Sequence, residues 1–138
     1  MRPTRRTRGF TLLELMVVLT IVAIILAIAV PTFYSQLRKS RRSEILAQLQ
    51  SLVLSQEQYR ANNTSYATAA QLGNPSATHY TITVTLDATN PERTYTLTAT
   101  AKSGDDQLKD KANGSVCTPL SIVSTAGSQS KSPTNCWQ

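Results

Sequence analysis

The chain has a long apolar run near its start, from Phe10 to Val30. Its 21 residues include three polar side chains, those of Thr11, Glu14 and Thr20. A helix rises 1.5 Å per residue, so this run would extend about 31 Å, enough to cross the hydrocarbon core of a bilayer. The pattern therefore predicts a membrane-spanning helix that carries one carboxylate.

After this run, the residues of one helical face recur at spacings of three and four. No glycine or proline interrupts the chain between Thr32 and Gln71. Pro31 separates the two patterns, and a proline inside a helix removes one hydrogen bond and produces a kink. We therefore expect one bent helix from Phe10 to about Ala61, with residues 10–31 in the membrane and residues 32–61 against a globular head. The recurring residues of the second part are Leu37, Arg41, Ile45, Leu49, Leu52, Gln56 and Tyr59.

Alternation of apolar and polar residues predicts two strands, over residues 80–86 and 95–99. The link between them contains Asn90-Pro91, which favours a hairpin. A weaker third strand is expected around residues 116–123, where Pro119 suits an edge or a bulge. No fourth strand is evident in the sequence. The tail from Thr125 to Gln138 is rich in Ser, Gly and Pro like a linker, but a disulfide at Cys136 and the neighbouring Trp137 would tie it down. Residues 62–78 are expected to form a polar surface loop.

The apolar faces of the strands and of the second helical segment must cover each other. The stripe formed by Ile45, Leu49, Leu52 and Tyr59 is the available partner for the strand residues. This pairing predicts an α+β fold, in which a helix lies across an antiparallel sheet within a head spanning residues 62–138. The strand residues expected to face inward are Tyr80, Ile82, Val84, Leu86, Tyr95 and Leu97.

The two cysteines, Cys117 and Cys136, follow an export segment, which is typical of one disulfide formed in an oxidising compartment. A bridge closing a loop of this size stabilises by roughly 3 kcal/mol in the chain-entropy model. Two free buried thiols are the less favoured alternative. His79 is the single histidine, so the cysteines do not complete a zinc site.

The net charge of +6 is concentrated near the N-terminal segment. Four arginines precede the apolar run, and four basic residues at positions 38–42 follow it as a predicted solvated shoulder. From Ala61 onward the charges balance, which disfavours an extended nucleic-acid-binding surface. A local patch of Lys102, Lys109 and Lys111 keeps DNA binding open.

Three aspartates lie close together at Asp105, Asp106 and Asp110. Calcium takes several oxygen ligands, so a calcium site is one interpretation of this cluster. The interleaved Lys109 and Lys111 favour a solvated turn instead, and we expect no metal. The scattered carboxylates and single histidine form no catalytic constellation, so we expect no enzyme and no cofactor.

Glu14 is costly inside a membrane helix, by about 2.5–3.5 kcal/mol on insertion scales, and such a group is normally paired and functional. The alternative is that it reaches the interface unaided. A basic leader with Arg2, Arg5, Arg6 and Arg8 ends at Gly9, before the apolar run. Ala27-Ile28-Ala29 would suit cleavage of an ordinary secretory signal, but the apolar run is too long for one and contains an acid.

The stretch Arg8-Gly9-Phe10-Thr11-Leu12-Leu13-Glu14 resembles the cleavage and assembly motif of type IV prepilins, with its class III leader. The tail, Cys117 to Ile122 and Pro133 to Trp137, is similar to that of minor pilins of the PilE kind. This resemblance implies a kinked helix, a four-stranded sheet and a C-terminal loop closed by a disulfide between Cys117 and Cys136. A pseudopilin of a type II secretion system is the related alternative, made less favourable by that loop.

The resemblance further implies that a prepilin peptidase removes residues 1–9 by cutting between Gly9 and Phe10, and methylates the new amine of Phe10. Glu14 would pair with the terminal amine of a neighbouring subunit. The expected location is the inner membrane, with the N-terminus cytoplasmic and the head periplasmic, and then the pilus at the cell surface. The expected partners are other pilin subunits and the membrane assembly machinery. The expected roles are pilus initiation, twitching motility, adhesion or DNA uptake, including a head that binds DNA or a surface.

Overall fold

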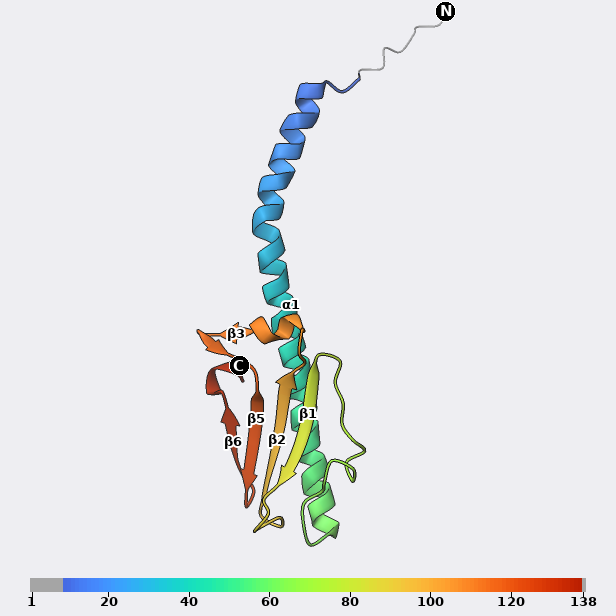
Figure 1. Ribbon diagram of the computed structural model, residues 1–138, viewed down its shortest axis with the longest axis vertical. Coiled ribbons are helices and arrows are strands. Elements are labelled where there is room, and N and C mark those ends of the chain that lie inside the picture. Colours follow the sequence, from blue (N-terminus) through green and yellow to red (C-terminus); the bar gives the residue numbers. More distant parts are fainter. Residues whose placement is uncertain (1–8, 138) are drawn as a thin grey trace, which may run out of the picture. The chain divides into compact units, whose positions relative to one another are not determined.

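The computed structural model describes residues 9–137, and the chain divides into two compact units after Gln36. One helix, α1 (Leu12–Asn62), runs through both units (Figure 1). The predicted single long helix is confirmed, although it begins two residues after Phe10 and ends one residue after Ala61. Pro31 lies inside α1. The bend at Pro31 stays a prediction.

The second unit contains a four-stranded antiparallel sheet in the order β1-β2-β5-β6 (Figure 1). Strand β1 (Tyr80–Leu86) pairs with β2 (Thr94–Ala101), which confirms the predicted hairpin. Strand β5 (Leu120–Thr125) pairs with β2, and β6 (Ser128–Ser132) pairs with β5. The sheet therefore has the antiparallel topology that the alternating sequence predicts.

The predicted third strand over residues 116–123 is wrong in its bounds. The chain forms two separate strands here, β4 (Ser115–Val116) and β5, with Pro119 immediately before β5. Strand β4 pairs with β3 (Lys111–Ala112) in a small second sheet. Proline cannot donate to a strand ladder, so the pairing with β2 begins only at Leu120.

The disulfide ties down the tail as expected, and the tail also contains the fourth strand, β6, and a short 3₁₀ helix, η2 (Thr134–Cys136), which the sequence did not reveal. The turn between β5 and β6 is two residues long, and both Ala126 and Gly127 have positive φ angles of 51° and 84°. Two left-handed residues give the turn a twist that matches paired antiparallel strands. The sequence concealed this hairpin because alanine rarely takes that conformation and because β6 has no apolar residues.

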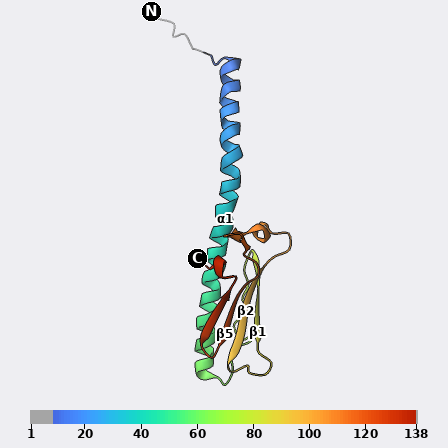
Figure 2. The same cartoon turned by 90° about the vertical axis from the view of Figure 1, so that its left-hand side faces the viewer.

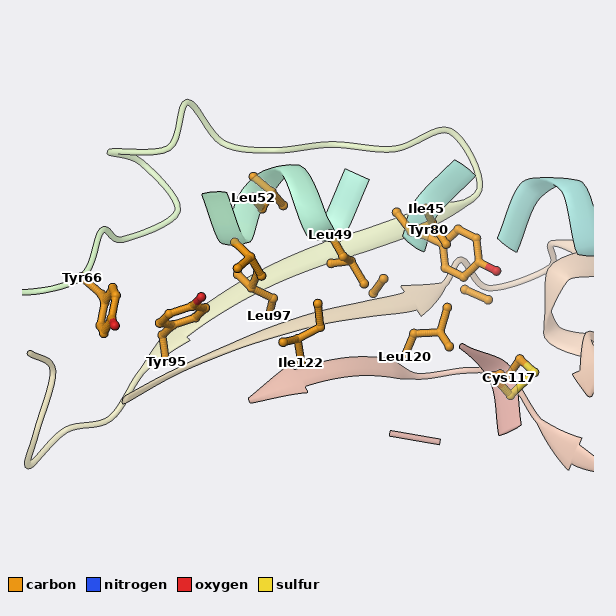
Figure 3. Close-up of a cluster of buried hydrophobic side chains, with 14 residues drawn as sticks. Ile45, Leu49, Leu52, Tyr66, Tyr80, Tyr95, Leu97, Cys117, Leu120 and Ile122 are labelled. Atoms are coloured by element: carbon orange, nitrogen blue, oxygen red, sulfur yellow. A yellow bond between two sulfur atoms is a disulfide. The ribbon is translucent and has the colours of Figure 1, made fainter. Parts of the chain in front are cut away.

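The core lies between the second part of α1 and one face of the sheet (Figure 2). Figure 3 shows Leu49 of α1 beside Leu97 of β2 and Ile122 of β5, all fully buried. The predicted helix stripe is confirmed at Ile45, Leu49 and Leu52, whereas Tyr59 is half-buried. All six strand residues that were expected to face inward lie on the core side: Tyr80, Ile82, Val84, Leu86, Tyr95 and Leu97.

The loop between α1 and β1 is partly built into the core. Tyr66 is buried, and its ring meets that of Tyr95 edge to face, with centroids 4.5 Å apart (Figure 3). The buried Gln56 side chain donates to the carbonyl of Ala67 at 2.8 Å and accepts from its amide at 2.7 Å. These contacts fix a segment that the polar sequence predicted to cross the surface.

Candidate functional site: the apolar helix and the arginine–aspartate cluster

The residues of the expected cleavage site lie at the start of α1. Gly9 and Phe10 are exposed and precede the helix. Thr11 caps it, because its hydroxyl accepts a hydrogen bond from the amide of Glu14 at 3.2 Å. This places Glu14 at the third helical position, where the helix dipole favours a negative charge. The spacing of Thr11 and Glu14 was visible in the sequence, but its capping role was not recognised.

The hydroxyl groups of Thr20 and Thr32 are satisfied within the helix. The Thr20 hydroxyl contacts the carbonyl oxygens of Met16 and Val17 at 2.6 and 3.0 Å. The Thr32 hydroxyl donates to the carbonyl of Ile28 at 3.0 Å. Within residues 9–137, the Glu14 carboxylate forms no hydrogen bond or ion pair. Unlike Thr20 and Thr32, Glu14 therefore needs a partner from outside the subunit once it leaves water.

The apolar side chains of the first unit are uncovered. This part of α1 is long and apolar enough to span a membrane, and none of the span is buried. Phe10, Leu12, Leu13 and Ile28 are each at least 70% exposed. Such a surface is stable only in lipid or against other apolar chains, so burial of this surface must come from outside the subunit.

The prediction of a solvated shoulder at positions 38–42 is wrong for the three arginines, which contact aspartates, whereas Lys39 is exposed. Arg38 forms an ion pair with Asp106 at 2.7 Å, and Arg41 lies 4.0 Å from Asp105. Asp105 caps the 3₁₀ helix η1 (Asp106–Lys109) by accepting from the amide of Gln107. The error arose because the arginines and aspartates are far apart in sequence, and only the fold brings them together.

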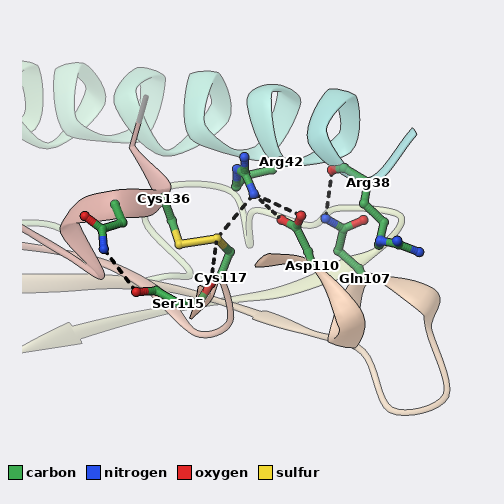
Figure 4. The surroundings of a disulfide bond; sticks show 8 residues. Arg38, Arg42, Gln107, Asp110, Ser115, Cys117 and Cys136 are labelled. Carbon is green, nitrogen blue, oxygen red and sulfur yellow. Dashed lines mark hydrogen bonds and ion pairs between the residues drawn. A yellow bond between two sulfur atoms is a disulfide. The ribbon is translucent and has the colours of Figure 1, made fainter. Parts of the chain in front are cut away.

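Arg42 forms the buried member of this cluster (Figure 4). Its Nη1 group donates to both carboxylate oxygens of Asp110, at 2.9 and 2.8 Å, and both side chains are about 95% buried. The same nitrogen lies 3.2 Å from the sulfur of Cys117, which is bonded to Cys136. The predicted disulfide is thus present, and the Cys117 amide also donates to the carbonyl of Asp110. The arrangement connects α1, η1 and the C-terminal loop.

The predicted alternative of a calcium site is not favoured by this geometry. Asp105 contacts His79 Nδ1 at 2.8 Å, and the hydrogen bond from His79 holds the pKa of Asp105 below its usual value. The hydrogen bond from Arg38 likewise lowers the pKa of Asp106. Over residues 9–137, no group of three or more His, Cys, Asp or Glu side chains is arranged to hold a metal ion.

The lysine patch proposed for DNA is divided by an ion pair. Lys102 and Lys111 are exposed and form no ion pair within the described part of the chain. Lys109 lies 3.3 Å from Asp106, although its side chain is 77% exposed. Two lysines of the patch are therefore free to meet an anion, while the third is shared with an aspartate.

An unburied apolar helix that continues into a head, where it packs on an antiparallel sheet closed by a disulfide, defines the type IV pilin class. Two family models agree with that architecture. Residues 4–30 match the prokaryotic N-terminal methylation motif. Residues 31–121 match the model described as type IV minor pilin ComP, DNA uptake sequence receptor. The chain belongs to this ComP family of type IV minor pilins. Pilins are structural proteins.

Curated relatives are similar over shorter stretches. The type IV major pilin protein PilA of Myxococcus xanthus is 39% identical over 62 residues, which cover 45% of this chain and 28% of PilA. The type IV wide pilus major component PilA4 of Thermus thermophilus is 36% identical over 62 residues, covering 45% of this chain and 47% of that protein. The type II secretion system core protein G of Klebsiella pneumoniae is 34% identical over 67 residues, covering 49% and 48%.

The chain thus spans about half the length, or less, of these curated relatives. No solved structure matches the chain. The N-terminal methylation motif and the apolar helix that follows it indicate a membrane-anchored pilin.

Proposed function

We propose that this chain is a minor subunit of a type IV pilus. Residues 10–31 hold the precursor in the inner membrane, with the N-terminus in the cytoplasm and the head in the periplasm. A prepilin peptidase cuts between Gly9 and Phe10 and methylates the Phe10 amine, and the membrane assembly machinery then transfers the subunit into the filament. The observation that carries this proposal is the apolar part of α1, whose membrane-length span has no buried residue.

Glu14 guides assembly in this proposal by pairing with the terminal amine of a neighbouring Phe10. A carboxylate transferred into an apolar bundle carries a large desolvation penalty unless a cation meets it. The hydroxyl groups of Thr20 and Thr32 donate hydrogen bonds to carbonyl oxygens of the helix, whereas the Glu14 carboxylate has no hydrogen-bond partner in the described residues. A cut subunit provides the missing cation, because cleavage creates the amine on Phe10. Cleavage and assembly are thereby coupled.

The test compares three variants expressed in a strain that makes the pilus. Glu14→Gln removes the charge and keeps the shape, so we expect a cut and methylated protein that stays in the membrane and is depleted from sheared filaments. Gly9→Val leaves a full-length precursor, because the cleavage site is lost. Thr20→Val is the matched control, since it removes a polar group that needs no partner, and its incorporation stays normal.

Intact mass and N-terminal sequence of each fraction give the decisive readout. A start at N-methyl-Phe10 with a mass two hydrogens short, which reflects the disulfide, supports the proposal. A start at Val30 would replace it with a soluble exported domain. Normal filament incorporation of Glu14→Gln would remove the pairing role while leaving the pilus assignment intact. Co-purification with a type II secretion complex instead of a pilus would favour the pseudopilin alternative.

A second role, DNA binding by the head, is favoured by the family description as a DNA uptake sequence receptor. Lys102 and Lys111 are exposed and meet no carboxylate within the described residues, so they are available to phosphates. Lys109 contributes when its ammonium group exchanges the ion pair with Asp106 for one with a DNA phosphate. Binding through lysines to phosphates depends strongly on salt, because condensed counterions are released.

The DNA experiment uses the full chain in detergent micelles and a fluorescent duplex. Replacing Lys102, Lys109 and Lys111 together by Ala is expected to weaken binding and to lower the salt slope by about 0.9 for each phosphate contact that is lost. Lys131→Ala is the control, because Lys131 lies over the Trp137 ring, 5.3 Å from its centroid, and outside the patch. A triple variant that assembles into pili but fails in uptake makes DNA binding the primary role. Unchanged binding places the DNA surface elsewhere.

A further inference from the structure

The sheet has an outer face built almost entirely of hydroxyl side chains. The core occupies the opposite face, where α1 packs (Figure 2). Of the thirteen outward residues, eight are threonine, four are serine and one is valine, and none is buried. The members are Thr81, Thr83, Thr85, Thr94, Thr96, Thr98, Thr100, Ser121, Val123, Thr125, Ser128, Ser130 and Ser132.

The strand register arranges these residues, which we call the hydroxyl face, in rows that cross all four strands. One row joins Thr83, Thr98, Ser121 and Ser132, and the next joins Thr85, Thr96, Val123 and Ser130. Neighbours within a row are separated by roughly 4.8 Å, and successive rows by about 6.7 Å, as the geometry of a pleated sheet requires. The fourth strand, β6, widens the array by one column of serines.

The protein itself does not use these hydroxyl groups. Among the side-chain hydrogen bonds of residues 9–137, none involves a hydroxyl of this face. Each hydroxyl retains one donor and two acceptor sites for an external group. The face also carries no charged residue, although solvated sheet edges and surfaces usually include lysine and other charged side chains.

We propose that the hydroxyl face binds a neutral polysaccharide. Its lack of charge gives phosphate-bearing ligands, such as nucleic acid or anionic lipid, no counter-charge to pair with. A neutral glycan matches it, because sugar hydroxyls form hydrogen bonds with the rows while the threonine methyl groups meet the C–H surfaces of the sugar rings. Each hydrogen bond adds little in water, so affinity depends on many simultaneous contacts along an extended glycan. This role is separate from filament assembly and from the lysine patch.

The test measures retention of full-length protein in micelles on microcrystalline cellulose, an uncharged insoluble glucan. Thr83→Val/Thr98→Val removes two central hydroxyls and keeps the branched shape that suits a strand. We expect about tenfold weaker retention, as the loss of two such hydrogen bonds predicts. Thr64→Val/Thr89→Val is the matched control, because both threonines are exposed on loops outside the face, and its retention equals that of the unmodified protein.

Salt and folding controls make the result decisive. Retention through uncharged groups persists at 1 M NaCl, whereas adsorption through lysines is screened. A urea unfolding midpoint within the error of the unmodified protein shows that the face variant is folded. The proposal is overturned if the unmodified protein is not retained, if both double variants are retained equally, or if salt releases the protein.

Discussion

Arg42 and Asp110 form an ion pair that is almost completely buried, with the Arg42 Nη1 atom 2.8 and 2.9 Å from the two carboxylate oxygens. The pair connects α1 to the segment just after η1, and it lies against the Cys117 sulfur (Figure 4). Neither residue can lose its partner without leaving a charge in the protein interior. The pair therefore holds α1, the segment after η1 and the start of the disulfide loop together at this end of the head.

We expect Arg42→Met to lower the free energy of unfolding by about 3–5 kcal/mol, because removing one member of a buried pair leaves the other uncompensated. Urea unfolding of the full chain in micelles, followed by Trp137 fluorescence, measures the change. The double variant Arg42→Met/Asp110→Leu removes both charges and should recover most of the loss. Lys39→Met, an exposed neighbour, should change the free energy by less than about 0.5 kcal/mol. A loss in Arg42→Met no larger than in Lys39→Met would contradict this account.

Gln56 is expected to anchor the loop between α1 and β1. Its buried amide satisfies both the N–H and the C=O of Ala67, so Gln56→Leu leaves two buried backbone groups without partners. Each such group costs about 1–3 kcal/mol, and we predict a loss of at least about 2 kcal/mol of unfolding free energy. Gln58→Leu, an exposed change two residues away, is the control. Amide hydrogen exchange at Ala67 should accelerate in Gln56→Leu alone, and an unchanged rate would argue that other contacts hold the loop.

The elements that could be predicted from the sequence are those whose patterns are local. The spacing of Ile45, Leu49 and Leu52 predicts the buried stripe of α1, and the alternation of Tyr80, Ile82 and Val84 predicts β1. The disulfide could be predicted because an exported chain with only two cysteines can form only one intramolecular disulfide. The N-terminal methylation motif over residues 4–30 could be predicted because it is a short contiguous pattern.

The features that escaped prediction depend on contacts between distant residues. Arg42 and Asp110 have polar side chains that a sequence pattern places in solvent, and only the packing of η1 on α1 buries them. Strand β6 consists of Ser, Gln and Lys residues, so its place in the sheet follows from the Ala126-Gly127 turn and from pairing with β5. Gln56 lay in the predicted helical face, but its bond to the Ala67 backbone was not visible.

Stability of the head should fall in acid because Asp105 and Asp106 have lowered pKa values. The His79 hydrogen bond is the main cause for Asp105, and the Arg38 hydrogen bond is the main cause for Asp106. A depressed folded pKa contributes stability that is present above the unfolded value of 3.8 and is lost as pH falls through the folded value. The urea midpoint should therefore be flat near pH 5 and decline below about pH 4.

The variant Asp106→Asn removes the contribution that Asp106 makes to this acid response through its contacts with Arg38 and Lys109. It should lower the urea midpoint at pH 5, where the aspartate is charged, and should match the original protein more closely at pH 2.5. Asp87 is a carboxylate whose pKa is lowered by the backbone N–H groups of Asn90 and Thr89 and not by an arginine. Its effect on stability in acid should therefore remain in the Asp106→Asn variant. An acid decline that is equally steep in Asp106→Asn would assign the effect to the other carboxylates.

The disulfide is expected to hold the last strand of the sheet in place. Cys136 lies in η2, directly after β6, and β6 contributes no apolar side chain to the core. Without the bridge, β6 retains its ladder with β5 and the contact of Lys131 with Trp137, which are weak restraints. Cys117→Ser/Cys136→Ser should therefore lower the unfolding free energy by roughly 3 kcal/mol. It should also accelerate amide exchange in β6 before that in β1 and β2. Uniform acceleration across all four strands would mean that the bridge stabilises the head as a whole, and that β6 does not depend on it specially.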